Sequence, residues 1–407
     1  METKKTSISM ERLKASLSTF STFGKTPNNG VTRLALSHED IKARTYFQEQ
    51  CEALGLHVTV DDLGNMYAVL PGKHPEKPPL YMGSHLDTVK KGGRFDGVLG
   101  VAAALEVVTT LIEQGIEPNR PVGIINFTNE EGARFEPSMM ASGIVSGKFD
   151  KDAMFTKQDP SGVTFAEALQ SSGFVGDKKN RLNKAEAFLE LHIEQGPVLE
   201  QEDLQIGVVE CVVGMCCYEI EITGKSNHAG TTPQTMRSDA LTTANQCLTA
   251  FHEKLPALDS ELVYTMGRFS VSPNIHTVIP NKVVFSIEAR HKDEAVIKEV
   301  EQIILSVVEQ ASLPAQATKL WGRETVWFHS DLVNSVEEAT RAHGFSYKRM
   351  VSGAGHDAQF IAGMVPTAML FVPSTGGISH AEEEYTSWED CANGATILYE
   401  TVLDKIN

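Results

Sequence analysis

The feature that most constrains this chain of 407 residues is a change of residue periodicity near residue 212, which reverses near residue 327. Before residue 212, apolar runs of buried-strand length (Leu80–Gly83, Val122–Thr128) alternate with helical segments (His38–Leu54, Gly100–Gln114). Alternation of this kind is typical of an α/β fold with a mostly parallel sheet and helices on both faces. We predict such a fold for this part of the chain.

The middle of the chain has the pattern of a smaller α+β module. Alternating stretches at 218–223, 262–271, 283–290 and 317–321 are interleaved with helical stretches at 235–253 and 294–310. The resulting order, β-α-β-β-α-β, predicts a ferredoxin-like module. After residue 327 the α/β pattern returns. We therefore predict one larger domain, residues 1–212 with 327–407, interrupted by an inserted domain of residues 213–326.

Charge and hydropathy exclude some partners. The chain has 36 Lys and Arg against 53 Asp and Glu, a formal charge of −17, which argues against nucleic acid or an anionic membrane as main partner. The longest apolar stretch, Val98–Ile112, is interrupted by Glu106 and is too short to span a bilayer. Residues 1–10 are polar and have no apolar core of a secretory signal, so we expect a cytoplasmic protein.

The six cysteines show no CxxC pair, so we expect reduced thiols. Cys211, Cys216 and Cys217 are close in sequence and offer two interpretations, a metal site or small apolar residues of a strand. The strand is favoured, because alternation sends Cys216 and Cys217 to opposite faces.

Several histidines and acidic residues follow predicted strands. His85 ends an apolar strand, Asp87 follows it as a candidate hydrogen-bond partner for the imidazole, and Asp96 lies in a glycine-rich loop. Alternatively, this segment is a polar turn whose Asp caps the helix that follows.

A second acidic cluster, Glu130 and Glu131, follows the next strand. Adjacent carboxylates at a buried strand end are costly unless they bind a cation or stay solvated, so a metal ligand beside a general base and a solvated turn are both possible. His192 ends a later strand, and His380 lies in another glycine-rich loop. A lone histidine is more often a satisfied polar residue than a ligand. The coincidence of all these positions favours one shared metal site.

These segments resemble the dinuclear zinc-type aminoacylase and carboxypeptidase superfamily, and within it the hydantoinase/carbamoylase branch. The resemblance covers nearly the whole chain and rests on the segments GSHLDTVKKGGRFDG, NEEGARF, ELHIEQGPVLE, GKSNHAGTTP and SGAGHDAQ. His192 marks the branch, because peptidase members tend to carry an acidic ligand there. The fold implied is a catalytic domain interrupted by a lid that also dimerises.

The resemblance implies roles for individual residues. Asp96 would bridge two divalent metals, with the other ligands being His85, Glu131, His192 and His380. Zinc is the default, with Mn, Co or Ni also possible. His85 and His380 are expected on opposite metals, as are His192 and Glu131. Glu130 would be the general base, and Asp87 the partner that orients His85.

Substrate contacts are also implied by the resemblance. His228 would reach a neighbouring active site across a homodimer and stabilise the oxyanion, Arg290 would bind a substrate carboxylate, and Gln195 and His356 would bond near the scissile group. Branch members commonly have Asn thirteen residues before this Arg, where the chain has Thr277. A Thr hydroxyl cannot match the reach of an amide, so we expect looser carboxylate binding.

The predicted activity is hydrolysis of a non-peptide C–N bond in a small ureido or amide substrate that bears a carboxylate. N-carbamoyl-L-amino acid hydrolysis to amino acid, CO2 and ammonia is favoured. The alternatives are an allantoate amidohydrolase, then a dipeptidase or deacylase, and from another class a metal-free binding protein. Two bound metal ions per chain would favour the enzyme, and none would favour the binding protein.

Overall fold

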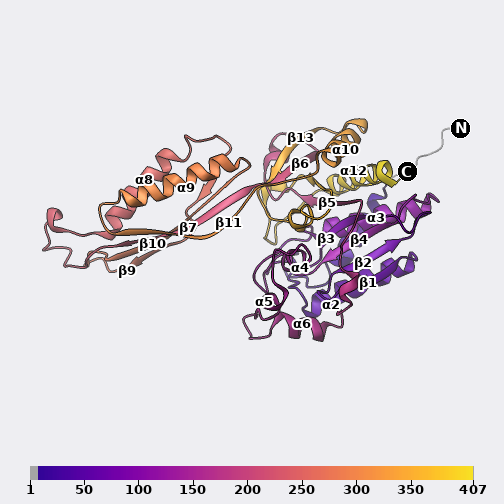
Figure 1. The fold of residues 1–407 in the computed structure, drawn as a ribbon, viewed down its shortest axis with the longest axis horizontal. Coiled ribbons are helices and arrows are strands. Elements are labelled where there is room, and N and C mark those ends of the chain that lie inside the picture. Colours follow the sequence, from indigo (N-terminus) through magenta and orange to yellow (C-terminus); the bar gives the residue numbers. More distant parts are fainter. Residues whose placement is uncertain (1–7, 407) are drawn as a thin grey trace. The chain divides into compact units, whose positions relative to one another are not determined.

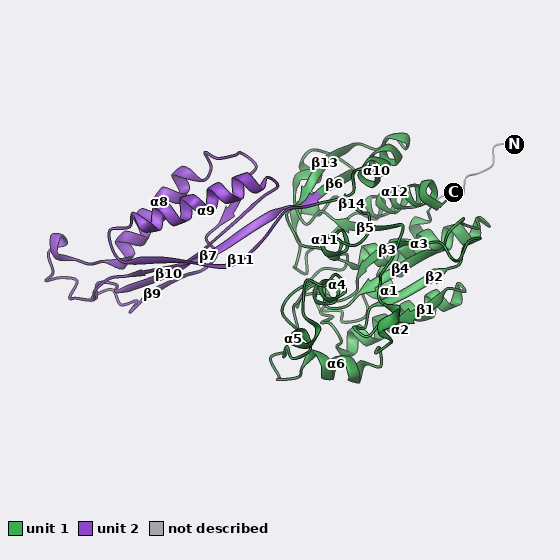
Figure 2. Cartoon of the chain, in the orientation of Figure 1, with its two compact units in different colours: residues 1–210, 327–407 green, residues 211–326 purple. Residues whose placement is uncertain are grey.

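The computed structural model describes residues 8–406 of the chain. The chain divides into two compact units, which we call unit 1 (residues 1–210 and 327–407) and unit 2 (residues 211–326) (Figure 2).

Unit 1 holds most of the helices and strands (Figure 1). With the strands β6 and β12 that cross the unit boundaries, they are α1 (Met10–Phe20), α2 (His38–Ala53), β1 (His57–Val60), β2 (Met66–Leu70), β3 (Leu80–His85), α3 (Val98–Glu113), β4 (Val122–Phe127), α4 (Met140–Val145), α5 (Lys151–Phe155), α6 (Phe165–Ser172), η1 (Lys178–Asn180), β5 (Ala187–Ile193), α7 (Val198–Gln201), β6 (Ile206–Val212), β12 (Val326–Trp327), α10 (Ser330–Ala342), β13 (Tyr347–Ser352), α11 (Asp357–Ile361), β14 (Thr367–Val372), η3 (Thr375–Gly377) and α12 (Trp388–Ile406). The predicted helices at 38–54 and 100–114 and the predicted strands at 80–83 and 122–128 are present, with ends that differ by at most two residues.

A mixed sheet forms the centre of unit 1. Its strand order is β1-β2-β4-β3-β5-β14-β6-β12, with β13 paired to β6. The central strands β4, β3, β5 and β14 run parallel, whereas the pairs β1–β2, β2–β4 and β14–β6 are antiparallel. The prediction of a mostly parallel sheet is therefore wrong for the outer strands. The pair β1–β2 needs no crossover helix, because Asp61 accepts the backbone N–H groups of Leu63 and Asn65 and so forms a tight turn.

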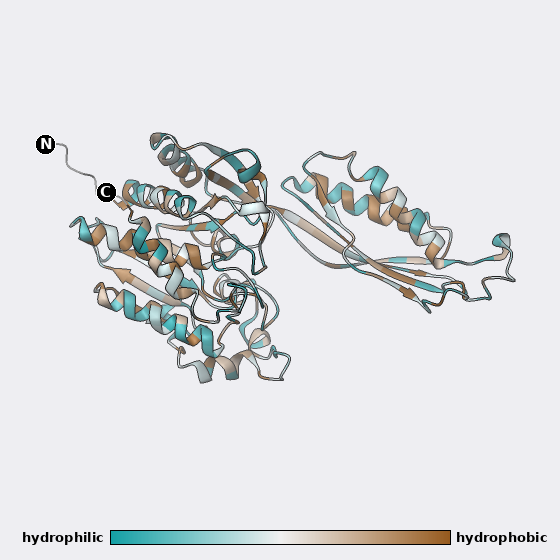
Figure 3. Cartoon of the chain, turned by 180° about the vertical axis from the view of Figure 1, so that it is seen from behind, coloured by the Kyte–Doolittle hydropathy of each residue, from teal (hydrophilic) through white to brown (hydrophobic). Residues whose placement is uncertain are grey.

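Helices cover both faces of this sheet. Leu191 of β5 faces α12, where a Cβ added to Gly394 would lie 2.7 Å from its side chain. Glu190 points to the opposite face, as alternation requires, and accepts the backbone N–H of Ala358 in α11. Apolar residues are concentrated in the central strands and on the helix surfaces that face them (Figure 3). The parallel centre is thus buried on both sides.

Unit 2 is a separate α+β layer structure. Its elements are β7 (Gly214–Thr223), η2 (Gln234–Met236), α8 (Ala240–Lys254), β8 (Val263–Thr265), β9 (Phe269–Ser272), β10 (Lys282–His291), α9 (Glu294–Glu309) and β11 (Ala315–Arg323). The strands pair antiparallel in the order β11-β7-β10-β8, with β9 also on β10. The helices α8 and α9 pack on this sheet around a core that includes Phe251, Phe285 and Val300.

The stretch 262–271, predicted as one strand, is divided into β8 and β9. Thr265 pairs with Glu288 and Phe269 with Phe285. The chain therefore advances four residues in this stretch while β10 advances three. The extra residue interrupts the ladder, as a β-bulge does.

Candidate metal centre

The carboxyl ends of the parallel strands meet at one edge of the unit 1 sheet, and the predicted ligands follow these ends. His85 is the last residue of β3, Glu130 and Glu131 come shortly after β4, and His192 is next to last in β5. His380 lies in the loop after β14 and η3. Parallel pairing therefore brings residues that are distant in sequence to one edge, where α/β sheets bind their ligands.

Asp96 lies between two groups of side chains. Its Oδ1 is 3.2 Å from Nε2 of His192 and 3.7 Å from Nε2 of His85. Its Oδ2 is 3.2 Å from Nε2 of His380. The next residue, Gly97, has a φ of +67°, and a Cβ there would lie 2.3 Å from the His85 ring, so this close approach requires glycine.

Two overlapping sets of ligand atoms result. One set comprises His85, Asp96 and His192, the other Asp96, Glu131 and His380, and within each set the atoms lie within 4.8 Å of one another. In the second set Oε2 of Glu131 is 3.3 Å from Nε2 of His380. The other oxygen of Glu131, Oε1, is buried and has no hydrogen-bond partner among residues 8–406.

This donor set suits divalent cations. Within the described residues, Asp96, Glu130 and Glu131 form ion pairs only with histidines. Buried carboxylates without Lys or Arg partners are costly unless a cation binds them. Imidazole and carboxylate ligands are those that zinc, manganese, cobalt and nickel accept.

The local electrostatics point the same way. Burial raises the pKa of Glu130 and of Glu131 well above the usual range, and nearby carboxylates raise both further. Burial would also raise the pKa of Asp96, but hydrogen bonds to His192 and His380 hold it well below the usual range. Burial lowers the pKa of His85 to about 4. Burial alone would lower the pKa of His192, but its hydrogen bond to Asp96 raises this pKa to about 9. Without a cation these crowded glutamates favour their protonated form, and a bound cation would favour the charged form.

Glu130 lies beside the first set without belonging to either. Its Oε2 is 3.6 Å from Nε2 of His85, and its side chain is 9% exposed. A carboxylate held there can exchange a proton with a group bound at the ligand atoms.

The backbone and the carboxylate of Asp87 contact different neighbours. Nδ1 of His85 lies 2.9 Å from the backbone oxygen of Asp87, whereas the carboxylate is 4.0 Å away. The carboxylate instead accepts the backbone N–H groups of Glu130 and Glu131, each at 3.2 Å. The prediction named Asp87 as the partner of His85 without naming the atom, and the backbone carbonyl is the closer acceptor. Asp87 links the β3 end to the turn that carries both glutamates.

Gln195 and His356, predicted to contact substrate, both lie against the ligand sets. Nε2 of Gln195 donates to Oδ2 of Asp96 at 2.8 Å. The His356 ring packs on His192 with centroids 4.5 Å apart, and its Nε2 is 2.9 Å from Oγ of Ser352. His356 is buried, so any bond to substrate would need local movement.

Three other predicted residues lie in unit 2. His228 is exposed, and its Nδ1 accepts the backbone N–H groups of Gly230 and Thr231 at 3.0 and 3.2 Å. In the neutral ring the proton is therefore on Nε2, which remains a donor. The backbone oxygen of Thr277 accepts the N–H of Ala229, which places Thr277 beside the His228 loop.

Arg290 lies inside β10 and pairs with Glu288, with its Nε 2.7 Å from Oε1. The alternating stretch predicted at 283–290 is extended by one residue at each end in β10, which runs from Lys282 to His291.

Sequence reasoning missed a buried carboxylate behind Asp96. Glu384 is 2% exposed, and its Oε1 accepts the backbone N–H groups of Phe95 and Asp96 at 3.2 and 3.1 Å. Its Oε2 accepts the hydroxyl of Ser379 at 3.0 Å. Glu384 thus ties the Asp96 loop to the His380 loop. It stands among three consecutive glutamates, and nothing in the pattern singles it out.

A second missed carboxylate is Asp357, the first residue of α11. It is fully buried and accepts a short hydrogen bond from the hydroxyl of Ser142. Burial is the largest cause of the raised pKa of Glu130, and the charge of Asp357 is the next largest. The segment SGAGHDAQ contains it, but the prediction names only His356 from that segment.

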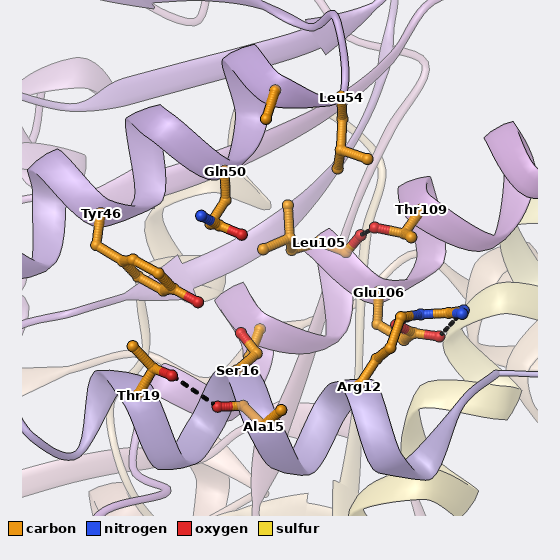
Figure 4. A pocket seen from close by; sticks show the side chains of 12 residues that line it. Arg12, Ala15, Ser16, Thr19, Tyr46, Gln50, Leu54, Leu105, Glu106 and Thr109 are labelled. Carbon is orange, nitrogen blue, oxygen red and sulfur yellow. Dashed lines mark hydrogen bonds and ion pairs between the residues drawn. The ribbon is translucent and has the colours of Figure 1, made fainter.

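A cavity elsewhere in unit 1 does not coincide with these residues. It measures about 310 Å³ and lies between α1, α2 and α3, where Arg12, Ser16, Tyr46, Gln50 and Leu105 line it (Figure 4). Its charged residues, Arg12 and Glu106, pair with each other at 2.8 Å. The residues that line this cavity include none of the two ligand sets, so we do not consider it part of the candidate metal centre.

No helix within residues 8–406 has the length and apolar character needed to cross a membrane.

Known proteins resemble this chain along nearly its whole length. It is 37% identical to an N-carbamoyl-L-amino-acid amidohydrolase of Rhizobium meliloti, covering 98% of this chain and 96% of that protein. It is 34% identical to an allantoate amidohydrolase of Escherichia coli strain K12, with 97% and 98% covered. The crystal structure of an amidase of the hydantoinase/carbamoylase family from Burkholderia multivorans superposes with a TM-score of 0.94 at 36% identity, covering 98% of both chains.

A family model described as peptidase family M20/M25/M40 matches residues 81–404, which include all the ligand atoms of both sets. The chain therefore belongs to peptidase family M20/M25/M40, and within it to the hydantoinase/carbamoylase family.

Proposed function

We propose that this protein is a metal-dependent amidohydrolase that cleaves a non-peptide C–N bond, with an N-carbamoyl-L-amino acid as substrate and amino acid, CO2 and ammonia as products. The observation that carries the proposal is the position of Asp96, whose two oxygens face two different sets of ligands. The two named relatives act, according to their names, on N-carbamoyl-L-amino acids and on allantoate, which supports this substrate class.

Two divalent ions would fill the two sets. His85 and His192 would hold one ion, Glu131 and His380 the other, and Asp96 would contact both. Zinc is the default, with manganese, cobalt or nickel as alternatives. When bound, such a pair supplies Lewis acidity, which acidifies water and polarises a carbonyl group.

Glu130 is the proposed general base. Its side chain is not needed in either ligand set, and its backbone is fixed by Asp87. Glu130 takes a proton from the attacking water and passes it to the leaving nitrogen, so that no proton is gained or lost overall.

Residues of unit 2 would bind the substrate. The Nε2–H of His228 is available to the oxyanion that develops on the substrate carbonyl. The Arg290 guanidinium, which pairs with Glu288 in the structure, would exchange this pair for two N–H bonds to the substrate carboxylate. Thr277 would contribute one hydroxyl to this carboxylate. Gln195 and His356, from unit 1, would bond near the scissile group.

We further propose that unit 2 is a ferredoxin-like lid through which two chains form a homodimer, with His228 acting on the partner's site. Mixing inactive His228→Ala chains with inactive Glu130→Gln chains would test this. Activity returning in mixed dimers supports action across the dimer, and continued inactivity after confirmed subunit exchange contradicts it.

A cytoplasmic location is proposed as well. All six cysteines are buried thiols, and no disulfide joins them within residues 8–406, which suits a reducing compartment. Tagging the chain with a fluorescent protein and fractionating the cells would test this, and a secreted product would contradict it.

The main alternative is an allantoate amidohydrolase, favoured by the similarity to the E. coli relative. The test is ammonia release from N-carbamoyl-L-amino acids, β-ureidopropionate, allantoate and a dipeptide by one metal-loaded preparation. The highest kcat/KM is expected for an N-carbamoyl-L-amino acid. A higher value for allantoate would replace the preferred substrate, and activity on the dipeptide alone would reject the proposed bond class.

A further inference from the structure

Unit 2 contains another group of metal-ligating side chains, outside the site described above. Asp259, Glu261 and His291 each offer one ligand atom, and these atoms lie within 4.8 Å of one another. Asp259 and Glu261 lie in the loop between α8 and β8, and His291 is the last residue of β10.

Strand pairing holds these residues together. Val263 of β8 pairs with Arg290 of β10, so the loop that leads into β8 lies beside the end of β10. Oδ1 of Asp259 accepts the backbone N–H of Glu261 at 2.7 Å, which folds the loop into a tight turn. The two carboxylates are thereby presented close to the imidazole.

His291 carries the second observation, because its buried ring nitrogen Nε2 faces the Asp259 carboxylate without a hydrogen bond of ordinary length. The side chain is 3% exposed, and Nε2 is buried without a hydrogen bond to any residue in the described range 8–406. Oδ1 of Asp259 lies 3.6 Å from it, too far for an ordinary hydrogen bond. Two ligands of one tetrahedral zinc ion, with bonds of about 2.0–2.1 Å, are about 3.4 Å apart. The separation therefore fits two ligands of one ion better than a direct bond.

The other ring nitrogen allows Nε2 to act as a ligand. Nδ1 lies 3.0 Å from the backbone nitrogen of Asp293 and 3.4 Å from its backbone oxygen. The backbone N–H of Asp293 donates to Nδ1, so the neutral ring carries its proton on Nε2. Metal binding would move this proton to Nδ1, which can donate to the Asp293 oxygen, and would leave the Nε2 lone pair facing the carboxylates. A backbone carbonyl behind the second nitrogen is the usual support of a metal-bound histidine. Without a metal, the Nε2–H is a buried donor that faces Oδ1 of Asp259 at 3.6 Å and has no hydrogen bond within residues 8–406.

The surrounding charge selects the class of ion. Two carboxylates face one ammonium group, that of Lys292, which lies 2.6 Å from Oε2 of Glu261. One imidazole and two carboxylates suit zinc and other first-row transition metals, whereas calcium and magnesium prefer oxygen ligands alone.

We propose that Asp259, Glu261 and His291 form a mononuclear transition-metal site in unit 2, with zinc as the fitting ion and water as the remaining ligand. The site is independent of the proposed reaction, because none of its residues belongs to the ligand sets of unit 1. An ion there would tie the loop before β8 to the end of β10.

The test counts zinc on the full-length protein. Chelator-treated protein is incubated with zinc alone, passed through a desalting column and analysed for zinc per chain. Asp259→Asn and His291→Asn should each lower the content by one equivalent relative to the unsubstituted chain. His252→Asn is the matched control, because His252 also lies in unit 2 but bonds to Tyr264 and does not belong to the group. The same loss of one equivalent should appear in an Asp96→Asn background.

Two results would overturn the proposal. One is an equal zinc content in the unsubstituted chain and in Asp259→Asn, and the other is a loss of one equivalent in His252→Asn. If the buried His291→Asn variant fails to fold, the more exposed Asp259→Asn variant decides alone. Cobalt(II) gives an independent readout, since visible absorption typical of tetrahedral cobalt should remain in Asp96→Asn and vanish when Asp259→Asn is added. Absorption that persists after this second change would contradict the site.

Discussion

Oδ1 of Asp96 lies 3.2 Å from Nε2 of His192. This pair joins the glycine-rich loop before α3 to the end of β5, and it leaves Oδ2 of the same carboxylate for His380. One carboxylate is thereby shared by two sets of ligands, a geometry that suits two neighbouring ions.

Glu130→Gln should keep the metals and lose turnover. The amide preserves the shape of the side chain but cannot take a proton from water, and Glu130 belongs to neither ligand set. A loss of about 10²–10⁴-fold in kcat is expected from removal of a general base. Metal content and kcat should be measured on the same sample. A metal-loaded variant with unchanged kcat would show that another group is the base.

Glu384→Ala should weaken metal binding, whereas Glu384→Gln should largely preserve it. Alanine leaves the buried N–H groups of Phe95 and Asp96 without their acceptor, while the Gln carbonyl oxygen can still accept both. Loss of such a supporting residue typically costs about 10–100-fold in metal affinity. Titration with a competing chelator measures this, and Glu383→Ala, at the exposed neighbour, is the control. Equal affinities for all three variants would contradict a positioning role.

Removing the metals should make stability fall as pH rises from about 6.5 to 9. His192 has a folded-state pKa of about 9, since its bond to Asp96 outweighs burial, against an ordinary 6.5. The folded state therefore keeps a proton that the unfolded chain releases, and this stabilisation is full below pH 6.5 and lost as pH passes 9. The slope for this group is at most about 1.4 kcal/mol per pH unit.

Burial also raises the pKa of Asp87 and of Glu384, each to about 7. These two carboxyl groups also make stability fall as pH rises, but their part of the fall ends near pH 7. Melting temperatures of chelator-treated protein at pH 7 and 9 measure the effect, and His192→Asn should show a shallower fall. Metal-loaded protein should show little of it, because a ligated imidazole carries no extra proton. An identical fall in His192→Asn would assign the effect to other groups.

Arg290→Lys should weaken binding of a carboxylate substrate. Lysine keeps the charge but loses the planar fork, and each charge-assisted bond is worth about 1.5–3 kcal/mol when desolvated. Thr277→Asn should have the opposite effect, mainly through KM, because the carboxylate is remote from the reacting carbon. The measurement is kcat and KM for the acid and amide forms of one N-carbamoyl amino acid. Equal discrimination between the two forms in all variants would place carboxylate recognition elsewhere.

Much of the candidate site is readable in the sequence because its ligands follow strongly apolar strands. His85 lies at the end of one apolar strand, and Glu130 and Glu131 follow the next one. Because the carboxyl ends of parallel strands meet at one edge of a sheet, the sequence pattern predicts that these residues lie close together. The motif segments then select the same residues independently.

Other features depend on tertiary contacts that no local pattern encodes. Glu384 differs from Glu382 and Glu383 only in its burial behind the Asp96 loop. The acceptor for His85 is the backbone oxygen of Asp87. A sequence motif predicts which residue contacts His85 but not which atom of that residue does so. Strand β13 was missed because its residues are mostly half-buried, and α11 spans only five residues, too few to show a helical period.

The most direct test of the central claim is ammonia release from an N-carbamoyl-L-amino acid by three preparations, namely metal-loaded protein, chelator-treated protein and metal-treated Asp96→Asn. The metal-loaded protein should release one ammonia for each free amino acid formed. The chelator-treated protein should be inactive until metal is restored, and Asp96→Asn should stay inactive in excess metal. Equal rates in all three preparations, or no ammonia from metal-loaded protein with any ureido substrate, would contradict the central claim.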